Sequence, residues 1–260
     1  MWRENDEMNE LFAGDGPLIA AHRGFAVDAP ENTLAAFSAA VKAGADLLEI
    51  DVHGSRDNVA MVTHDPGLRR VAGRSGLVAE MTSDELRRLD LGGHTMPTLE
   101  ETLDAFPHER FSIDVKDERA VEPTISAIER TQAQNRVLIA SFSEKRRRQV
   151  VSRLGQVKTI GTHRHAVAAW SIIPPLHRAL GPIDALFLPT KAYGFSMFSP
   201  RMVATAARHN VTLGAWTIND PEEMEALWRA GVQVIVTDRT DLAVESRARL
   251  ADEPTSPSRH

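Results

Sequence analysis

PLIAAHRGFAVDAPENTLAAFSAAVKAGADLLEIDV, residues 17–52, contains two short apolar runs separated by a segment with helical periodicity. PLIAAH (17–22) precedes the helical segment ENTLAAFSAAVKAG (31–44), and ADLLEIDV (45–52) follows it. Short apolar runs divided by helices are typical of strands that pair in parallel. The stretch therefore predicts a strand–helix–strand unit.

The same alternation continues along the chain. A short apolar run at 59–64 follows the second strand, and further barrel strands are expected at 110–116, 136–141, 156–161, 183–188, 211–217 and 232–238. Helices are expected at 120–132, 143–154, in a stretch that ends at 180, and at 199–210, 220–231 and 241–251. The result is eight strand–helix units, which in a chain of 260 residues favour a single closed TIM (β/α)8 barrel over an open doubly wound sheet.

One segment interrupts this rhythm. Residues 66–97 hold five glycines and scattered charges, so we expect a small insertion after the second strand. Its place beside polar strand ends suggests that it caps the barrel mouth. We expect the barrel to occupy residues 1–250, and the polar, proline-containing residues 251–260 to form a disordered tail.

Composition excludes several classes of function. The net charge is -6, which disfavours a nucleic-acid surface and tight docking on anionic membranes. There is no cysteine, so disulfide and thiolate chemistry are excluded. The acidic N-terminal residues do not resemble a secretory signal, and no apolar run approaches the length of a membrane span. We expect a cytoplasmic protein without stable membrane insertion, and its oligomeric state is left open.

Acidic side chains gather at the expected strand ends. Glu49 and Asp51 share one strand face because they are two residues apart, and Asp114 and Lys116 repeat this spacing on the next barrel strand. Barrel enzymes keep their active sites at the C-terminal ends of the strands. Neighbouring acids repel one another, so they either pair with basic groups at the rim or share a cation. We favour Glu49, Asp51 and Asp114 as oxygen ligands of Mg²⁺ or Ca²⁺.

Histidines accompany these acids. His22 and His64 each follow a strand and stand beside a charged residue, Arg23 and Asp65 respectively. A single histidine would more often be a satisfied core residue, but a pair of them suits acid–base chemistry. Arg23 is either a rim ion-pair residue or a phosphate ligand, and the second role is favoured beside a metal. Lys116 has the same two interpretations.

Other polar and aromatic features have structural interpretations too. Phe142 and Trp216 lie at strand ends, where they either belong to the core or form a substrate wall. Pro30-Glu31-Asn32-Thr33 suits the first turn of a helix. The basic run at 145–148 reads as a solvated helix face without function.

Taken together, these residues resemble the glycerophosphodiester phosphodiesterases. The resemblance rests on HRG (22–24), PENT (30–33), EIDV (49–52), HD (64–65), PTLEE (97–101), IDVK (113–116), SF (141–142), WTIN (216–219) and VTDR (236–239). It covers about residues 18–245 and is specific only as a set.

The resemblance implies a TIM barrel with an insertion after the second strand. It also implies hydrolysis of glycerophosphodiesters to glycerol 3-phosphate and an alcohol, with a divalent cation. The expected roles are metal binding by Glu49, Asp51 and Asp114, proton transfer by His22 and His64, and substrate or phosphate binding by Arg23, Lys116, Phe142 and Trp216. Glu31, Asn32 and Asp65 are expected to support these side chains.

The chain departs from the family pattern at three places. Asp114 stands where the family usually has a glutamate, Asn58 stands where it usually has a glycine, and His53 is an additional imidazole near the acids. Two alternative functions stay open: a lysophospholipase D, which would need an apolar groove, and a non-catalytic binding barrel.

Overall fold

The computed structural model describes residues 11–12, 16–162, 164–165, 181–192 and 195–252. Most of the helical stretch expected up to residue 180 lies outside the described residues, as do residues 253–260 of the expected tail. The first residues of that tail belong to a helix instead, because α11 (Thr240–Asp252) continues through Asp252.

Eight parallel strands of the described part form a nearly closed barrel, which confirms the predicted fold class. A parallel bridge between Ile160 and Ala185 brings the two ends of the sheet together. The strand order is β6-β5-β4-β2-β1-β11-β10-β7. In chain order the strands are β1 (Leu18–His22), β2 (Leu47–Gly54), β4 (Phe111–Val115), β5 (Val137–Ala140), β6 (Lys158–Thr159), β7 (Ala185–Leu188), β10 (Thr212–Ala215) and β11 (Val234–Thr237).

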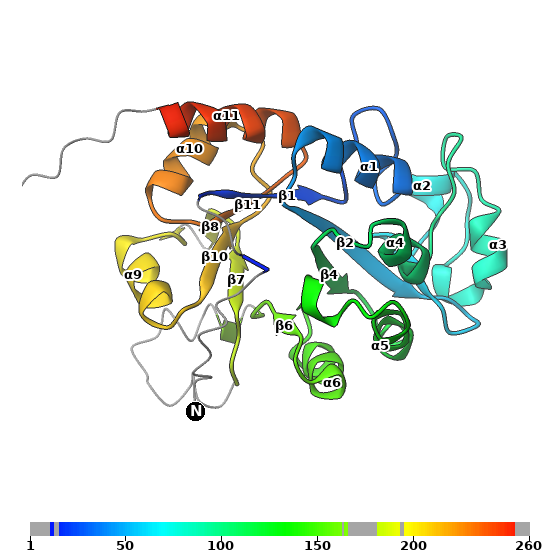
Figure 1. Ribbon diagram of the computed structural model, residues 1–260. Helices are drawn as coiled ribbons and strands as arrows, with labels where there is room; N and C mark the ends of the chain where they lie inside the picture. Colours follow the sequence, from blue (N-terminus) through cyan, green and yellow to red (C-terminus); the bar gives the residue numbers. More distant parts are fainter. Residues whose placement is uncertain (1–10, 13–15, 163, 166–180, 193–194, 253–260) are drawn as a thin grey trace, which may run out of the picture.

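Helices surround these strands on the outside of the barrel (Figure 1). They are α1 (Leu34–Ala43), α4 (Leu99–Ala105), α5 (Val121–Arg130), α6 (Glu144–Leu154), α9 (Pro200–Arg208), α10 (Pro221–Arg229) and α11. Their starts follow local sequence, since Ser199 and Asp220 accept backbone N–H groups just before a proline at the first helical position. Among the described residues, no helix is long and apolar enough to cross a membrane.

The segment 66–97 lies beside β2 and β3 (Ala60–Val62), at the right of Figure 1. β3 pairs antiparallel with the end of β2 and is not a barrel strand, and Asn58 turns the chain between them with a φ of 63°. The segment contains α2 (Arg69–Ala72), the 3₁₀ turn η1 (Val78–Glu80) and α3 (Ser83–Arg87). It packs on a small core of its own, which consists of Met61, Leu68, Val78, Leu86, Leu89, Leu91 and Met96.

Three further short elements belong to the described structure. The 3₁₀ turn η2 (Gln134–Arg136) precedes β5. The strands β8 (Lys191–Ala192) and β9 (Phe195–Ser196) pair antiparallel with each other, apart from the barrel.

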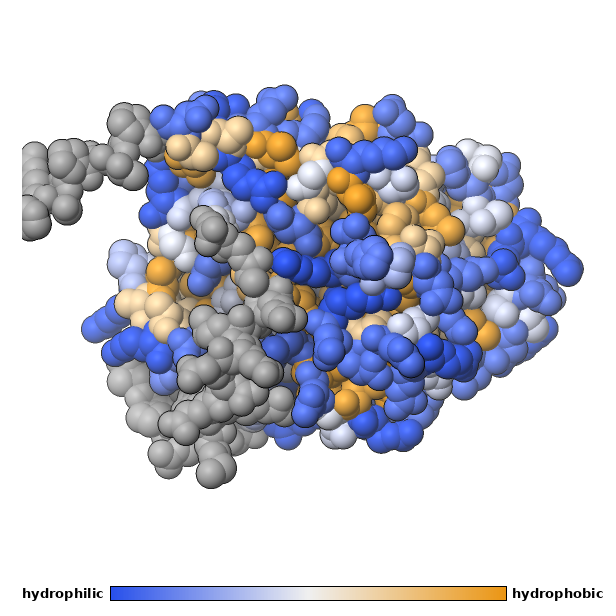
Figure 2. Space-filling view, in the orientation of Figure 1, coloured by the Kyte–Doolittle hydropathy of each residue, from blue (hydrophilic) through white to orange (hydrophobic). Residues whose placement is uncertain are grey.

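Successive side chains of each strand point alternately into the barrel and towards the helices, which produces two apolar layers. The interior is filled by side chains such as Leu18, Ala20, Leu47, Leu138 and Val234, and Gly214 leaves room there because a Cβ would lie 2.4 Å from the Phe187 ring. The intervening residues face the helices. The surface in the orientation of Figure 1 is mostly hydrophilic (Figure 2). At the C-terminal ends of the strands, the positions that face inward hold charged residues instead of apolar ones.

Candidate active site

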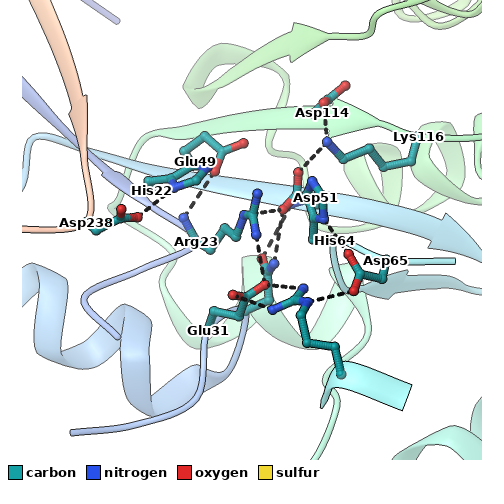
Figure 3. Close-up of polar contacts among 12 residues, drawn as sticks. His22, Arg23, Glu31, Glu49, Asp51, His64, Asp65, Asp114, Lys116 and Asp238 are labelled. Atoms are coloured by element: carbon teal, nitrogen blue, oxygen red, sulfur yellow. Dashed lines mark hydrogen bonds and ion pairs between the residues drawn. The ribbon is translucent and has the colours of Figure 1, made fainter. Parts of the chain in front are cut away.

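Strand register brings the predicted site residues together. His22 on β1 pairs in register with Glu49 on β2, and Asp51 pairs with Asp114 on β4. Figure 3 shows these side chains in one cluster, with His64, Arg23 and Lys116 directed towards it. The predicted acids, histidines and cations therefore meet at the C-terminal ends of neighbouring strands.

Lys116 joins two of the three acids. Its Nζ lies 2.7 Å from Asp51 Oδ1 and 2.6 Å from Asp114 Oδ2. Burial alone would raise the pKa of Asp51. The charge and hydrogen bond of Lys116, the Arg23 charge and the Asn32 hydrogen bond together outweigh burial, and this pKa lies below its usual range. For Asp114 burial prevails over Lys116, so the pKa of this carboxyl is raised. The other carboxylate oxygen, Asp114 Oδ1, is buried without a hydrogen-bond partner.

Glu49 is the third acid of the cluster. Burial and the neighbouring Asp51 charge raise the pKa of Glu49 to about 8. Its Oε2 accepts a hydrogen bond from the Arg23 backbone N at 3.1 Å. Burial and the neighbouring carboxylate thus disfavour the ionised form of Glu49 unless a cation lies between the acids.

A divalent cation fits this donor set by its chemistry. Glu49, Asp51 and Asp114 offer only oxygen, which Mg²⁺ and Ca²⁺ prefer, and Asp114 Oδ1 still lacks a partner. The described residues contain no three His, Cys, Asp or Glu side chains already arranged around a metal position. Lys116 stands between two of the proposed ligands, so metal binding requires its ammonium to release at least one of them.

His22 is oriented by an aspartate from the far end of the chain. Its Nδ1 lies 2.7 Å from Oδ1 of Asp238, which follows β11. Asn219 donates from Nδ2 to the other oxygen of Asp238 at 2.8 Å. Burial lowers the pKa of His22, but the Asp238 hydrogen bond and the Glu49 charge outweigh it, and the pKa lies above 6.5. With Nδ1 bonded to Asp238, Nε2 is the ring nitrogen left for chemistry.

His64 has an equivalent partner. Its Nδ1 lies 2.6 Å from Oδ1 of Asp65, and Arg70 on α2 donates from Nε to Asp65 Oδ2 at 2.6 Å. The Arg70 guanidinium lowers the pKa of Asp65 to about 2. Asp65 is therefore a permanent acceptor for the His64 ring at neutral pH.

His53, noted in the sequence as an additional imidazole, lies behind His64. Its Nε2 is 3.0 Å from the His64 carbonyl oxygen, and its Nδ1 is 2.6 Å from Asp117 Oδ2. Both partners are acceptors, so a ring nitrogen of His53 that carries a hydrogen donates to the partner it faces. This buried ring holds the backbone of His64.

The structure corrects the prediction that Pro30-Glu31-Asn32-Thr33 forms the first turn of a helix. α1 starts at Leu34 with Thr33 as its cap, so Glu31 and Asn32 precede the helix. Asn32 has a left-handed φ of 57° and donates from Nδ2 to Asp51 Oδ2 at 3.1 Å. Glu31 accepts from Arg23 Nη1 at 3.1 Å. These side chains bond to the site because the chain turns back on itself before the helix.

A tight turn makes that arrangement possible. Gly24 has a φ of 85°, and a Cβ there would lie 2.8 Å from the carbonyl carbon of Ala36. Arg23, just before it, has a φ of 57°. Its Nε lies 3.3 Å from Asp51 Oδ2, so the guanidinium is directed into the acid cluster.

Exposed aromatic side chains border the cluster. Phe142 is 64% exposed and Trp216 is 36% exposed, although both are large and apolar. Their rings meet edge to face with 6.3 Å between centroids, and Lys116 Nζ lies 5.6 Å from the Phe142 centroid. The structure thus places them on the surface beside Lys116 and outside the core.

The interpretation of the basic run 145–148 as a solvated face is wrong for two of its residues. Arg147 is 2% exposed and pairs with Glu144 at 2.7 Å. Arg146 donates from Nε to the carbonyl of Val115 and to Ser141 Oγ. The helix turns these side chains towards the barrel, where carbonyl and hydroxyl acceptors at strand ends satisfy them.

Sequence reasoning assigned no role to Asp238, Asn219, Asp117 or Arg70. Asn219 and Asp238 belong to the motifs WTIN (216–219) and VTDR (236–239). The sequence therefore indicated their importance but not the contact of Asp238 with His22. Arg70 had no signal, because its partners Glu31 and Asp65 are distant in the chain or separated by a turn.

The fold and site define an α/β barrel that gathers a carboxylate cluster, two histidines and basic side chains at one end, an arrangement typical of a barrel enzyme. The model of the glycerophosphoryl diester phosphodiesterase family matches residues 22–242. The chain is 37% identical over 241 residues to the probable glycerophosphodiester phosphodiesterase 2 of Mycobacterium tuberculosis, covering 90% of this chain and 91% of that protein. It is 31% identical to the glycerophosphodiester phosphodiesterase of Caldanaerobacter subterraneus, covering 85% and 93%.

Solved structures show the same fold. A phosphodiesterase of Oleispira antarctica, in complex with the product sn-glycerol-3-phosphate, superposes with a TM-score of 0.73 at 24% identity, covering 88% of this chain and 96% of that one. The chain belongs to the glycerophosphoryl diester phosphodiesterase family. The predicted family and the predicted enzyme class, a phosphoric diester hydrolase, are confirmed.

Proposed function

We propose that the protein hydrolyses glycerophosphodiesters to glycerol 3-phosphate and an alcohol, with a divalent cation and a pair of histidines. The observation that carries this proposal is the register that sets Glu49, Asp51 and Asp114 side by side next to His22. Arg23 and Lys116 add positive charge within the same cluster. The family membership supports the reaction class.

The acids are proposed to hold Mg²⁺ or Ca²⁺. When bound, such an ion lowers the pKa of a coordinated hydroxyl and neutralises phosphate charge. Arg23 and Lys116 would contribute phosphate contacts, and Lys116 becomes free to do so when it releases an acid. Phe142 and Trp216 would form an apolar wall for the substrate carbons.

The histidines are proposed to move protons through Nε2. One takes the proton of a glycerol hydroxyl as its oxygen forms a bond to phosphorus. The other protonates the oxygen of the leaving alcohol as its bond to phosphorus breaks. Water then opens the resulting cyclic phosphate by the reverse proton transfers. Asp238 and Asp65 keep each ring in the required tautomer.

A substrate panel tests this function. Glycerophosphocholine, glycerophosphoethanolamine, glycerophosphoglycerol and lysophosphatidylcholine are each assayed with added Mg²⁺ or Ca²⁺ and with a chelator. The proposal expects glycerol 3-phosphate from the water-soluble diesters and loss of turnover with the chelator. Turnover of the lysolipid alone would favour the lysophospholipase D alternative. The cytoplasmic location and the absence of nucleic-acid partners stay predictions.

A further inference from the structure

Arg70 comes from outside the barrel and does not belong to the metal or proton-transfer groups. It lies on α2 in the segment 66–97, and its side chain is 46% exposed. Leu68, two residues earlier and immediately before α2, is fully buried in the small core of that segment. Packing of Leu68 therefore fixes the position from which Arg70 reaches the site.

The Arg70 guanidinium contacts two acids with three different nitrogens. Nε donates to Asp65 Oδ2 at 2.6 Å. Nη1 and Nη2 donate to the two oxygens of Glu31, each at 2.8 Å. Such bidentate, charge-assisted pairs are strong and specify geometry as well as charge.

One branch of this network leads to His64. Asp65 uses its second oxygen, Oδ1, to bind His64 Nδ1 at 2.6 Å. A carboxylate held at both oxygens has little freedom to rotate, so Arg70 fixes the plane in which Asp65 meets the imidazole. The direction of His64 Nε2 follows from that plane.

The other branch leads to Arg23. Glu31 Oε1 accepts from Arg23 Nη1 at 3.1 Å, and Arg23 also lies 3.3 Å from Asp51. Glu31 divides its charge between two guanidinium groups because Arg70 binds it. Without Arg70, the whole charge of Glu31 would face Arg23 and compete with a phosphate for it.

We propose that Arg70 is a positioning residue through which the 66–97 segment orients His64 and keeps Arg23 available to phosphate. The inference rests on the proposed function and deepens it. It gives the 66–97 segment a specific role beside the expected cap over the barrel mouth, which stays a prediction: the segment supports His64 and Arg23 through Arg70.

Arg70→Gln tests the role, with Arg69→Gln as the matched control. Arg69 is the exposed neighbour on the same helix. Arg70→Gln is expected to lower kcat/KM for glycerophosphocholine by about 10–100-fold, as for other groups that orient a reactive ligand, with a lower kcat and a higher KM. Arg69→Gln is expected to match wild type in both constants.

Further variants separate the branches. Asp65→Asn is expected to lower kcat with little change in KM. The double variant Arg70→Gln/Glu31→Gln is expected to have a lower KM than Arg70→Gln, because the competing charge on Arg23 is removed. Arg70→Lys keeps the charge but not the fork, so it is expected to fall between wild type and Arg70→Gln.

A spectroscopic measurement avoids dependence on activity. In ¹⁵N-labelled protein without substrate, the ring Nδ1–H resonance of His64 is expected to shift in Arg70→Gln towards its position in Asp65→Asn, and to stay unchanged in Arg69→Gln. An unchanged resonance in folded Arg70→Gln, or wild-type kcat and KM in Arg70→Lys, would overturn the inference. If wild type releases no glycerol 3-phosphate, the proposed function fails, and the resonance still decides the role of Arg70.

Discussion

At the scale of single residues, His22 and His64 have the same arrangement of hydrogen-bond partners. Each ring is held at Nδ1 by an aspartate whose other oxygen has a donor of its own, Asn219 in one case and Arg70 in the other. The two arrangements differ in charge, because a neutral amide donates to Asp238 and a charged guanidinium donates to Asp65. The two rings are therefore prepared differently for proton transfer.

Removing either ring tests its role. His22→Ala and His64→Ala are each expected to lower kcat by about 10²–10⁴-fold, which is typical for loss of a general acid or base. The exposed His108→Ala serves as the control. Circular dichroism and thermal unfolding check that each variant is folded. Near wild-type turnover in one variant would make that histidine structural.

The Asp238–His22 pair predicts a pH-dependent stability. The folded pKa of His22 is raised above 6.5, so the stabilisation it gains from Asp238 is fully present below that pH and is lost as pH rises through the folded value. The Tm difference between wild type and Asp238→Asn is expected to be larger at about pH 6 than at about pH 9. Exposed Asp104→Asn is the control, with a difference that does not follow this trend. A constant difference for Asp238→Asn contradicts the coupling.

At the scale of elements, the strand-end loops carry the exposed aromatic pair. Phe142 follows β5 and Trp216 follows β10, and their rings meet although the strands are not neighbours in the sheet. Strand positions were predictable from alternation and length. The burial of Arg147 was not, because its partner Thr159 comes within reach only when α6 packs against β6.

Truncating the aromatic wall is expected to weaken substrate binding. Phe142→Ala and Trp216→Ala should each raise KM by up to roughly tenfold with a smaller effect on kcat, since an aromatic contact contributes about 0.5–1.5 kcal/mol. Leu77→Ala, another exposed apolar residue in the 66–97 segment, is the control. Steady-state kinetics with glycerophosphocholine provide the comparison. An unchanged KM in both aromatic variants would remove them from the substrate wall.

At the scale of the whole molecule, the barrel and most of the candidate site residues followed from the sequence. Motifs at strand ends predicted which residues meet, since parallel strands finish at one end of a barrel. The pairing of His22 with Asp238 joins residues 216 positions apart, and Arg70 reaches Glu31 across 39. Such contacts depend on closure and loop packing, which local patterns do not encode. For Lys116 an ion pair was one of two interpretations, and its contact with both Asp51 and Asp114 follows from the register of β2 and β4.

Metal dependence is the prediction that involves the whole cluster. Exhaustive chelation is expected to abolish turnover, and Mg²⁺ or Ca²⁺ is expected to restore it. Calorimetric titration with the metal should show weaker binding to Asp114→Asn and retained or tighter binding to Asp114→Glu, whose longer side chain reaches further past Lys116. Full activity after chelation contradicts the assignment of the three acids.

The central claim is that this cluster cleaves a glycerophosphodiester on the alcohol side of the phosphate. A ³¹P NMR time course of glycerophosphocholine with the metal-loaded protein tests it most directly, because the phosphorus signal identifies the bond that breaks. The account predicts glycerol 3-phosphate from wild type and almost none from His22→Ala or His64→Ala. Phosphocholine as the product, or equal rates in all three proteins, would contradict it.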